Sequence, residues 1–311
     1  MIVSASSSLS YLAHGWLGAV LQHAGMFAAN RPLLQRNRGK AGDDILDTAQ
    51  VTKLLGLRYR VVRHVGSGAV GQVWLVRDKR TLCHRVVKFC CNSNQIQELS
   101  GVGASLSLRH PGLIDVLGYE KSEDGAFIWY FMPPADDLGG FPDILPRTYI
   151  PCTLEKYMAR KKALSASDCV EIAIELCAAL DYLHANGFVH QDIKPANIVR
   201  VGGRWQLADI GLMARIGYFR HFGTRGYIPP EGHGRRSGDI YSLGMVLSQM
   251  LNGGLRLERA KLEVATMAAK GDRRRLMEVA LKATAEASHD RYRSAKALSR
   301  ELRKIQRRLE K

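Results

Sequence analysis

Residues 189–199 read VHQDIKPANIV, and this stretch decides how the rest of the chain is interpreted. Asp192, Lys194 and Asn197 follow one another at spacings of two and three residues around a proline, with valine and isoleucine on both sides. Charged and amide side chains are costly to bury without partners, so the apolar neighbours predict a polar loop held by buried anchors. We expect this loop to do chemistry; the alternative is an ordinary surface turn.

The composition is that of a globular protein. With 311 residues and 46% hydrophobic content, the chain can form one large domain or two modest lobes with substantial cores. Its six cysteines are scattered and lack the paired spacing that a zinc site or a disulfide framework requires. This pattern favours free thiols in a reducing compartment, and we expect a cytoplasmic location.

The chain is strongly basic, with a formal net charge of +16. Residues 252–311 hold 17 Lys and Arg against 8 Asp and Glu, which is a local excess of 9. Such a surface attracts nucleic acid, acidic protein or anionic lipid, but a solvated face on the final helix is the simpler interpretation. No aromatic residue interleaves the terminal RELRKIQRRLEK, so we expect no specific nucleic-acid partner.

The N-terminal segment differs from the rest of the chain. Residues 1–30 contain no Lys, Arg, Asp or Glu, and the first charges are the basic ones within residues 31–40. We interpret residues 1–50 as a disordered extension. One alternative is a membrane helix over residues 9–29, whose basic flank would keep the bulk of the chain in the cytoplasm. A transit peptide would suit the Ser-rich, acid-poor composition, and Met26 is an alternative start.

Residues 57–78, LRYRVVRHVGSGAVGQVWLVRD, predict two strands joined by a glycine-rich turn. Gly66, Gly68 and Gly71 would let a phosphate group approach the backbone, because no Cβ stands in the way. A dinucleotide-binding fold would continue into a helix after such glycines, whereas this chain continues as a strand. The context therefore does not favour NAD.

The next predicted strand is HRVVKFCC, residues 84–91. It places Lys88 inside an apolar run, 17 residues after Gly71. A lysine inside a strand is costly unless an anion meets it, so we expect a phosphate or carboxylate partner. The alternative is a side chain that reaches the surface.

Six segments in this order resemble the protein kinase family: GSGAVGQV, VVK, HQDIKPAN, DIG, GTRGYIPPE and DIYSLG. The resemblance covers about residues 59–302 and implies an α+β, bilobal fold. The N-lobe, a small antiparallel sheet with one helix, would occupy residues 57–132, and a mostly helical C-lobe would occupy residues 153–311. HQDIKPAN is similar to the serine/threonine branch, and the compact length with DIG and PPEG is similar to bacterial serine/threonine kinases.

The resemblance implies transfer of the ATP γ-phosphate to Ser and Thr hydroxyls of proteins. Phosphoryl transfer needs positioning and charge neutralisation more than covalent help. Asp192 would accept or orient the substrate hydroxyl, and Lys194 would contact the γ-phosphate. Asn197 and Asp209 would hold Mg²⁺, or Mn²⁺ in its place, because such ions prefer oxygen ligands.

The nucleotide site is implied by the same resemblance. Lys88 would bind the α- and β-phosphates, held by an acid on the helix expected over residues 94–108. The family usually places this acid where Gly101 stands, and Glu98, one turn earlier, is the only acid of that helix. Further contacts are expected from the glycines and from the adenine pocket and hinge strand FIWYFM: Gly66, Gly68, Gly71, Val73, Val86 and Tyr130.

Two departures from the family concern regulation and packing. Gln191 stands where most kinases have an Arg that pairs with a loop phosphate, and a neutral amide cannot form that ion pair. Residues 212–230 contain no Ser, and Thr224 belongs by resemblance to the substrate platform. We therefore expect activity without loop phosphorylation. Ile210, in place of the usual Phe, should fill the same apolar site with less bulk.

The C-lobe carries several structural expectations. Asp239 should tie the backbone of the polar loop, and Glu231 should pair with Arg291, as the resemblance implies. A helix over residues 168–184 should open with a capping box of Asp168 and Glu171, and its core positions should be Val170, Ile174, Cys177 and Leu180. The stretch between Asp239 and Arg291 is short for the family. Residues 133–152 form an insertion after the hinge, expected as an ordered or extended loop.

Two alternatives keep the fold and change the function. A catalytically inactive pseudokinase scaffold is suggested by Gln191 and the displaced Glu98. Against it, the residues expected to carry transfer and to bind phosphate and metal are all present: Lys88, Asp192, Asn197 and Asp209. A small-molecule kinase is disfavoured by GTRGYIPPE, which resembles a platform for protein substrates.

Overall fold

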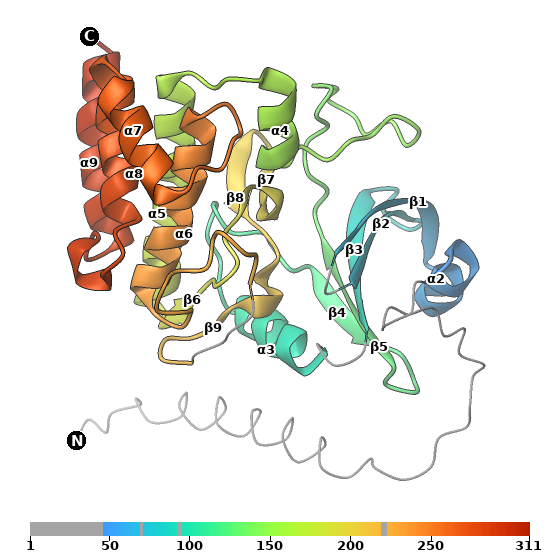
Figure 1. Cartoon of the computed structure of the whole chain (residues 1–311). Coiled ribbons are helices and arrows are strands. Elements are labelled where there is room, and N and C mark those ends of the chain that lie inside the picture. The colour runs from blue at the N-terminus through green and yellow to red at the C-terminus, as the bar shows by residue number, and fades with distance from the viewer. Residues whose placement is uncertain (1–45, 69–70, 92–94, 219–222) are drawn as a thin grey trace, which may run out of the picture. The chain divides into compact units, whose positions relative to one another are not determined.

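The computed structural model of the chain describes residues 46–68, 71–91, 95–218 and 223–311 (Figure 1). The expected extension over residues 1–50, with its alternative membrane helix over residues 9–29, lies outside the described residues except for its last five. Within the described ranges, no helix is long and apolar enough to span a bilayer.

The N-lobe is built on a five-stranded antiparallel sheet. Its order is β1 (Tyr59–Gly68), β2 (Gly71–Asp78), β3 (His84–Cys91), β5 (Phe127–Met132) and β4 (Gly118–Lys121). The strands predicted over residues 57–78 and 84–91 and the hinge strand are present. Helix α3 (Gln95–Ser105) follows β3.

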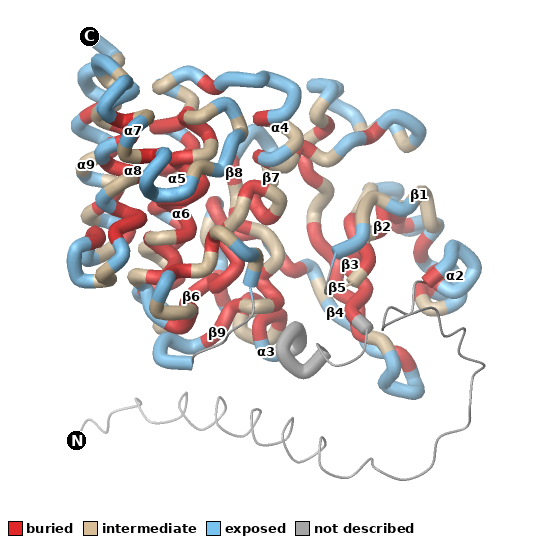
Figure 2. Tube along the Cα trace, viewed as in Figure 1, coloured by how far each residue is buried: buried red, intermediate tan, exposed pale blue. Residues whose placement is uncertain are grey.

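Both faces of this sheet are covered, because side chains alternate along each strand. One face carries Trp74, Phe89 and Trp129 and packs against helix α2 (Thr48–Leu55), which is not expected from the sequence and begins within the extension predicted over residues 1–50. The opposite face carries Val86 and Tyr130 and lies in a cluster with Val102 of α3. Figure 2 shows β3 and β5, inside the sheet, as largely buried, whereas β1 and β4 at its edges are mostly intermediate or exposed.

The C-lobe is mostly helical, which confirms the expected α+β bilobal fold (Figure 1). Its helices are α4 (Leu154–Lys161), α5 (Ala166–Ala185), α6 (Arg236–Leu251), α7 (Arg259–Ala268), α8 (Gly271–Ala283) and α9 (Ala295–Leu309). Two short ribbons complete it: β6 (Phe188–Val189) with β9 (Ala214–Arg215), and β7 (Ile198–Val201) with β8 (Arg204–Leu207).

The start of α5 corrects the predicted cap. The helix begins two residues earlier, and Ser165 is its N-cap: the Ser165 hydroxyl accepts from the Asp168 amide at 3.0 Å. Asp168 occupies the third position of the capping box and accepts from the Ser165 amide at 3.2 Å. The pairing of Asp168 with Glu171 is wrong because Ser165, three residues before Asp168, satisfies the same pattern. The four predicted core positions of α5 are buried, as expected.

The basic end of the chain forms an amphipathic helix. Ala295, Leu298, Leu302 and Ile305 are the buried face of α9, and α9 packs mainly on α5. The exposed residues of α9 include Lys296, Arg300, Arg303, Lys304, Arg307 and Arg308. This arrangement is the solvated basic face expected from the sequence.

The segment over residues 133–152 is ordered by its own contacts and contains no helix. Tyr149 is buried and donates its hydroxyl to the Ala135 carbonyl at 3.0 Å. The Asp137 carboxylate accepts from the amides of Gly139 at 2.6 Å and Ile150 at 3.1 Å. These bonds join the two ends of the segment into a closed loop.

Candidate active site

The polar loop, residues 190–197, is held through its backbone by Asp239 on α6. Asp239 accepts from the amides of His190 at 2.9 Å and Gln191 at 3.0 Å, and from His184 Nε2 at 2.8 Å. Burial would raise the pKa of Asp239, but the hydrogen bond from His184 lowers it below the usual value, so the carboxylate is ionised. The expected tie between Asp239 and the loop backbone is confirmed.

This anchoring forces a tight backbone, with Gln191 in the left-handed region at φ 71°. Ile193, two residues later, is fully buried as the apolar anchor. The polar side chains on either side of it then point to the same site. The alternation of polar and apolar residues in the sequence thus reflects a loop whose apolar side chain is buried in the core while its polar side chains face the site.

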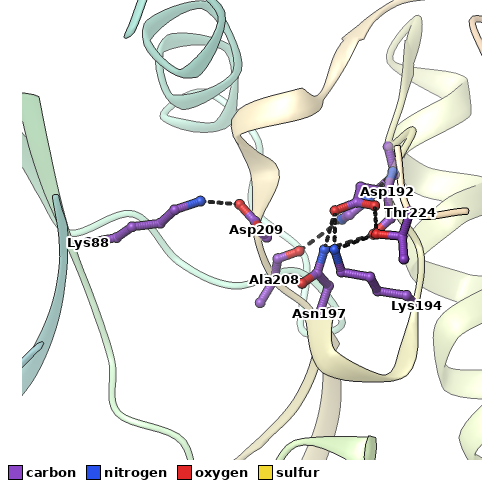
Figure 3. A network of polar contacts seen from close by, with 8 residues as sticks. Lys88, Asp192, Lys194, Asn197, Ala208, Asp209 and Thr224 are labelled. Atoms are coloured by element: carbon purple, nitrogen blue, oxygen red, sulfur yellow. Dashed lines mark hydrogen bonds and ion pairs between the residues drawn. The ribbon is translucent and has the colours of Figure 1, made fainter. Parts of the chain in front are cut away.

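Asp192, Lys194 and Asn197 meet as the sequence predicts (Figure 3). Lys194 Nζ donates to Asp192 Oδ2 at 2.9 Å, and Asn197 Nδ2 donates to the same oxygen at 2.7 Å. Asn197 Nδ2 also donates to the Asp192 carbonyl at 2.9 Å. The Asp192 carboxylate is therefore fixed in orientation, and a buried amide and a partly exposed ammonium compensate its charge.

A hydroxyl completes the cluster. Thr224 Oγ1 donates to Asp192 Oδ1 at 3.1 Å and accepts from Lys194 Nζ at 2.7 Å. Thr224 comes from a segment 32 residues further along the chain than Asp192. A Ser or Thr hydroxyl can thus reach both the carboxylate and the ammonium at hydrogen-bond distance.

Asp209 lies on the opposite side of the loop, toward the N-lobe sheet (Figure 3). It adopts φ 58° and precedes the short helix η3 (Ile210–Leu212). Lys88 on β3 forms an ion pair with Asp209 Oδ1. Burial would raise the pKa of Asp209, but the charge and the hydrogen bond of Lys88 lower it below the usual value. The anion predicted for buried Lys88 thus includes a carboxylate.

Backbone bonds through Ala208 join Asp209 to the polar loop. The Ala208 amide donates to the Asn197 carbonyl at 2.8 Å, and the Ala208 carbonyl lies 3.1 Å from His190 Nε2. Asn197 uses its side-chain nitrogen for Asp192, so its side-chain oxygen and the Asp209 carboxylate are the oxygens of this region that could hold a metal ion. Two oxygen ligands suit Mg²⁺, which usually keeps waters and takes the rest of its ligands from phosphates. Among the described residues no group of three His, Cys, Asp or Glu could hold a metal ion.

Four of the predicted nucleotide contacts, Lys88, Val73, Val86 and Tyr130, lie near one another on the sheet. Lys88 is opposite Val73 on β2 and opposite Tyr130 on β5. Val86, two residues from Lys88, shares its face of the sheet. Lys88 Nζ lies 5.9 Å from the centroid of the Tyr130 ring. The register therefore brings the lysine and the three apolar residues together.

The three glycines of the β1–β2 turn differ in their packing. A Cβ on Gly71 would lie 1.8 Å from the Phe89 carbonyl oxygen, so the sheet itself requires glycine there. A Cβ on Gly66 or Gly68 would meet no atom within 4 Å. Packing against the described residues therefore does not require glycine at these two positions, and the open space beside them could admit a ligand.

Glu98 lies on α3 by its backbone, and its side chain is outside the described part of the structure. Gly101, one turn later, packs directly against η3. A Cβ on Gly101 would lie 2.3 Å from the Ile210 carbonyl oxygen. Sequence reasoning missed this contact, and its one signal was a glycine inside a helix where the family usually has an acid. Ile210 is buried in the cluster between the sheet and α3, as expected.

The segment that follows η3 is joined to the polar loop by a hydrogen bond from an uncharged side chain. Gln191 Nε2 donates to the Tyr218 carbonyl at 3.0 Å. Further along, Arg291 pairs with Glu231 through both nitrogens of its fork, at 2.6 and 2.8 Å, which confirms the expected ion pair. Arg291 is buried. The segment is thus fixed at both of its ends.

Comparisons with known proteins agree with this geometry. A family model described as "Protein kinase domain" matches residues 59–309. The serine/threonine-protein kinase PknD of Chlamydia pneumoniae is 29% identical over 239 residues, covering 66% of this chain and 25% of that protein. A probable serine/threonine-protein kinase PknB of Lactococcus lactis is 23% identical over 222 residues, covering 66% of this chain and 33% of that protein. The chain thus spans about a quarter to a third of the length of these relatives.

Proposed function

Because this chain belongs to the protein kinase family, we propose that it transfers the γ-phosphate of ATP to Ser and Thr hydroxyls of protein substrates. The observation that carries the proposal is the pair of bonds made by the Thr224 hydroxyl, to the Asp192 carboxylate at 3.1 Å and to the Lys194 ammonium at 2.7 Å. An acceptor hydroxyl of a substrate needs the same two partners. The bacterial serine/threonine kinases among the relatives support this branch of the family.

The geometry supports the following roles for the residues. Asp192, held by Asn197 and Lys194, orients the acceptor hydroxyl and receives its proton. Lys194 neutralises charge on the transferred phosphoryl group. The side chains of Asn197 and Asp209 would hold a divalent ion, which supplies charge neutralisation to the phosphates when bound. Lys88 reaches the same side of the site and is suited to the α- and β-phosphates.

The nucleotide would lie between the glycine turn and the C-lobe. Gly66 and Gly68 leave open space above the backbone, where phosphates can approach. Val73 and Val86 offer an apolar surface on the face of the sheet that carries Lys88, and Tyr130 lies opposite Lys88 on the hinge strand. Glu98 remains the proposed acidic partner of Lys88.

The proposal is tested by transfer of radiolabelled phosphate from ATP and Mg²⁺ to the chain itself and to a generic protein substrate. Asp192→Ala and Lys88→Met should each abolish transfer, while Arg300→Gln on α9 should retain it. Binding of ATP without transfer, under varied metals and substrates, would favour the pseudokinase scaffold. Transfer to small hydroxyl compounds but to no protein would favour the small-molecule kinase.

A further inference from the structure

The surface beside the acceptor site is basic in a way that the transfer chemistry does not use. Residues 212–230 contain three Arg and no Asp or Glu. Of these, Arg225 directly follows Thr224, the residue whose hydroxyl contacts Asp192. Consecutive Cα atoms are about 3.8 Å apart. Arg225 is exposed and thus lies at the edge of the place where an acceptor hydroxyl would sit.

A cavity opens at this point. Its volume is about 410 Å³, and its walls come from residues 225–226, from α6 and from the start of α7. Arg256 lies in its wall and donates through Nη1 to the Arg225 carbonyl at 2.5 Å. The guanidinium of Arg256 also stands over the Tyr227 ring, 5.5 Å from its centroid. Arg225 and Arg256 therefore both line this cavity.

Gly226 leaves room for the Arg256 guanidinium beside the backbone. A Cβ on Gly226 would lie 2.2 to 2.7 Å from the guanidinium atoms of Arg256. The absence of a side chain lets Arg256 lie flat against the backbone, where stacking on Tyr227 holds the fork in place. Since an ordered guanidinium loses less freedom on binding, the site is suited to a carboxylate.

The other charged residues that line the cavity are Arg259, Glu258 and Glu286. Arg259 donates to the Thr284 carbonyl at 2.9 Å and pairs with Glu263 at 3.1 Å. Glu258 and Glu286 line the cavity from the start of α7 and from the end that follows α8. Neither Arg225 nor Arg256 has a carboxylate partner among the residues that the structure describes.

A carboxylate outside the cavity also acts on this region. Burial raises the pKa of the Tyr227 phenol, Arg256 lowers it, and Glu155 raises it with a smaller effect than Arg256.

We propose that this cavity binds an acidic side chain of the substrate, so that the chain phosphorylates Ser and Thr flanked by Asp or Glu. The inference rests on the proposed kinase function and adds the substrate class to it. An extended peptide advances about 3.3 Å per residue, so an acid one to three residues from the acceptor reaches Arg225 and Arg256.

The test compares three peptides of equal length with one Ser acceptor, flanked on both sides by Asp, by Ala or by Lys. For the wild-type chain, kcat/KM should be about tenfold higher with Asp than with Ala, which corresponds to about 1.4 kcal/mol, and lowest with Lys. The preference should weaken with added salt, because exposed ion pairs are screened. No preference, or a preference for Lys, would overturn the inference.

Three variants assign the effect to the cavity. Arg256→Gln and Arg225→Gln should each reduce the ratio of kcat/KM for the Asp peptide to kcat/KM for the Ala peptide about threefold to tenfold. Arg300→Gln removes the same charge from the exposed face of α9 and should keep the full preference. If Arg225→Gln, Arg256→Gln and Arg300→Gln reduce the preference for the Asp peptide equally, net charge rather than the cavity explains that preference. If Arg256→Gln does not fold, Arg225→Gln and the ranking of the peptides still decide.

A binding measurement separates this inference from the proposed function. A fluorescent Asp-flanked peptide with Ala in place of Ser should bind the wild-type chain by anisotropy and bind Arg256→Gln several-fold more weakly. If no peptide is phosphorylated but this difference appears, the kinase proposal fails and the acidic site stands. If peptides are phosphorylated but binding does not depend on Arg225 or Arg256, the acidic site fails and the kinase proposal stands.

Discussion

Replacing Gly101 by alanine tests whether contact between α3 and η3 sets the position of Asp209. The added Cβ would lie 2.3 Å from the Ile210 carbonyl oxygen and 2.7 Å from that of Gly211. Both neighbours are backbone atoms, which cannot rotate away as the end of a side chain can. An ordinary contact begins at 3.4 Å, so α3 and η3 must separate by about 1.1 Å.

This displacement should affect activity more than stability. In a helix, alanine is more favourable than glycine by about 1 kcal/mol, while overpacking costs about 1–3 kcal/mol. The net destabilisation should therefore be at most about 2 kcal/mol. A shift of about 1 Å in a catalytic group can lower the rate by about 100-fold. Because Asp209 directly precedes the displaced residues, we expect kcat to fall about tenfold to 100-fold.

Gly103→Ala provides the matched control, because it lies on the same helix and its Cβ would meet no atom within 4 Å. It should keep full activity and raise the melting temperature. The assay is phosphate transfer at saturating ATP together with thermal unfolding of both variants. Equal activity of Gly101→Ala and Gly103→Ala would show that α3 does not position Asp209.

Three further outcomes are expected. Phosphatase treatment should leave activity unchanged, because the neutral Gln191 amide holds the Tyr218 carbonyl without a phosphate; a loss that rephosphorylation restores would contradict this. Asp239→Asn should lower kcat and destabilise the fold by about 1–3 kcal/mol. Since the pKa of Asp239 is lowered on folding, its contribution is present above the ordinary carboxyl pKa of about 3.9 and is lost below it. The difference in melting temperature between wild type and Asp239→Asn should thus shrink from about pH 5 to pH 3, and a constant difference would argue against an ionised Asp239. Tyr149→Phe should cost about 0.5–1.5 kcal/mol in urea unfolding, because the Ala135 carbonyl loses its donor, with kcat unchanged; a raised KM for protein substrates at unchanged stability would instead give residues 133–152 a role in substrate binding.

Elements with strong local signals were predictable from the sequence. The strand over residues 84–91 agrees with β3, because β-branched and aromatic runs between turn residues are typical of strands. The meeting of Asp192 and Asn197 was predictable for a similar reason, since both belong to one short loop. Their positions depend on neighbours that are close in sequence and on Asp239, which the family resemblance supplied.

Features that depend on distant packing were not predictable. Helix α2 has a readable capping box of Asp47 and Gln50, but a helix of eight residues is unstable alone. Its stability comes from packing on Trp74 and Trp129 across the sheet. The contact of Arg256 with Arg225 joins residues 31 apart and depends on where the loop before α7 lies. The sequence contains no local pattern for such an approach.

Asp209 shows why the motifs alone do not determine the site. Lys88 reaches it from β3, α3 supports the residues after it through Gly101, and Ala208 ties the residue before it to Asn197. Each of these supports comes from a different part of the chain. A protein could keep all six motifs and still misplace the carboxylate if α3 moved away from η3. Gly101, which looks like a defect when the sequence is compared with the family, is therefore the residue that lets this helix approach closely enough to hold the site.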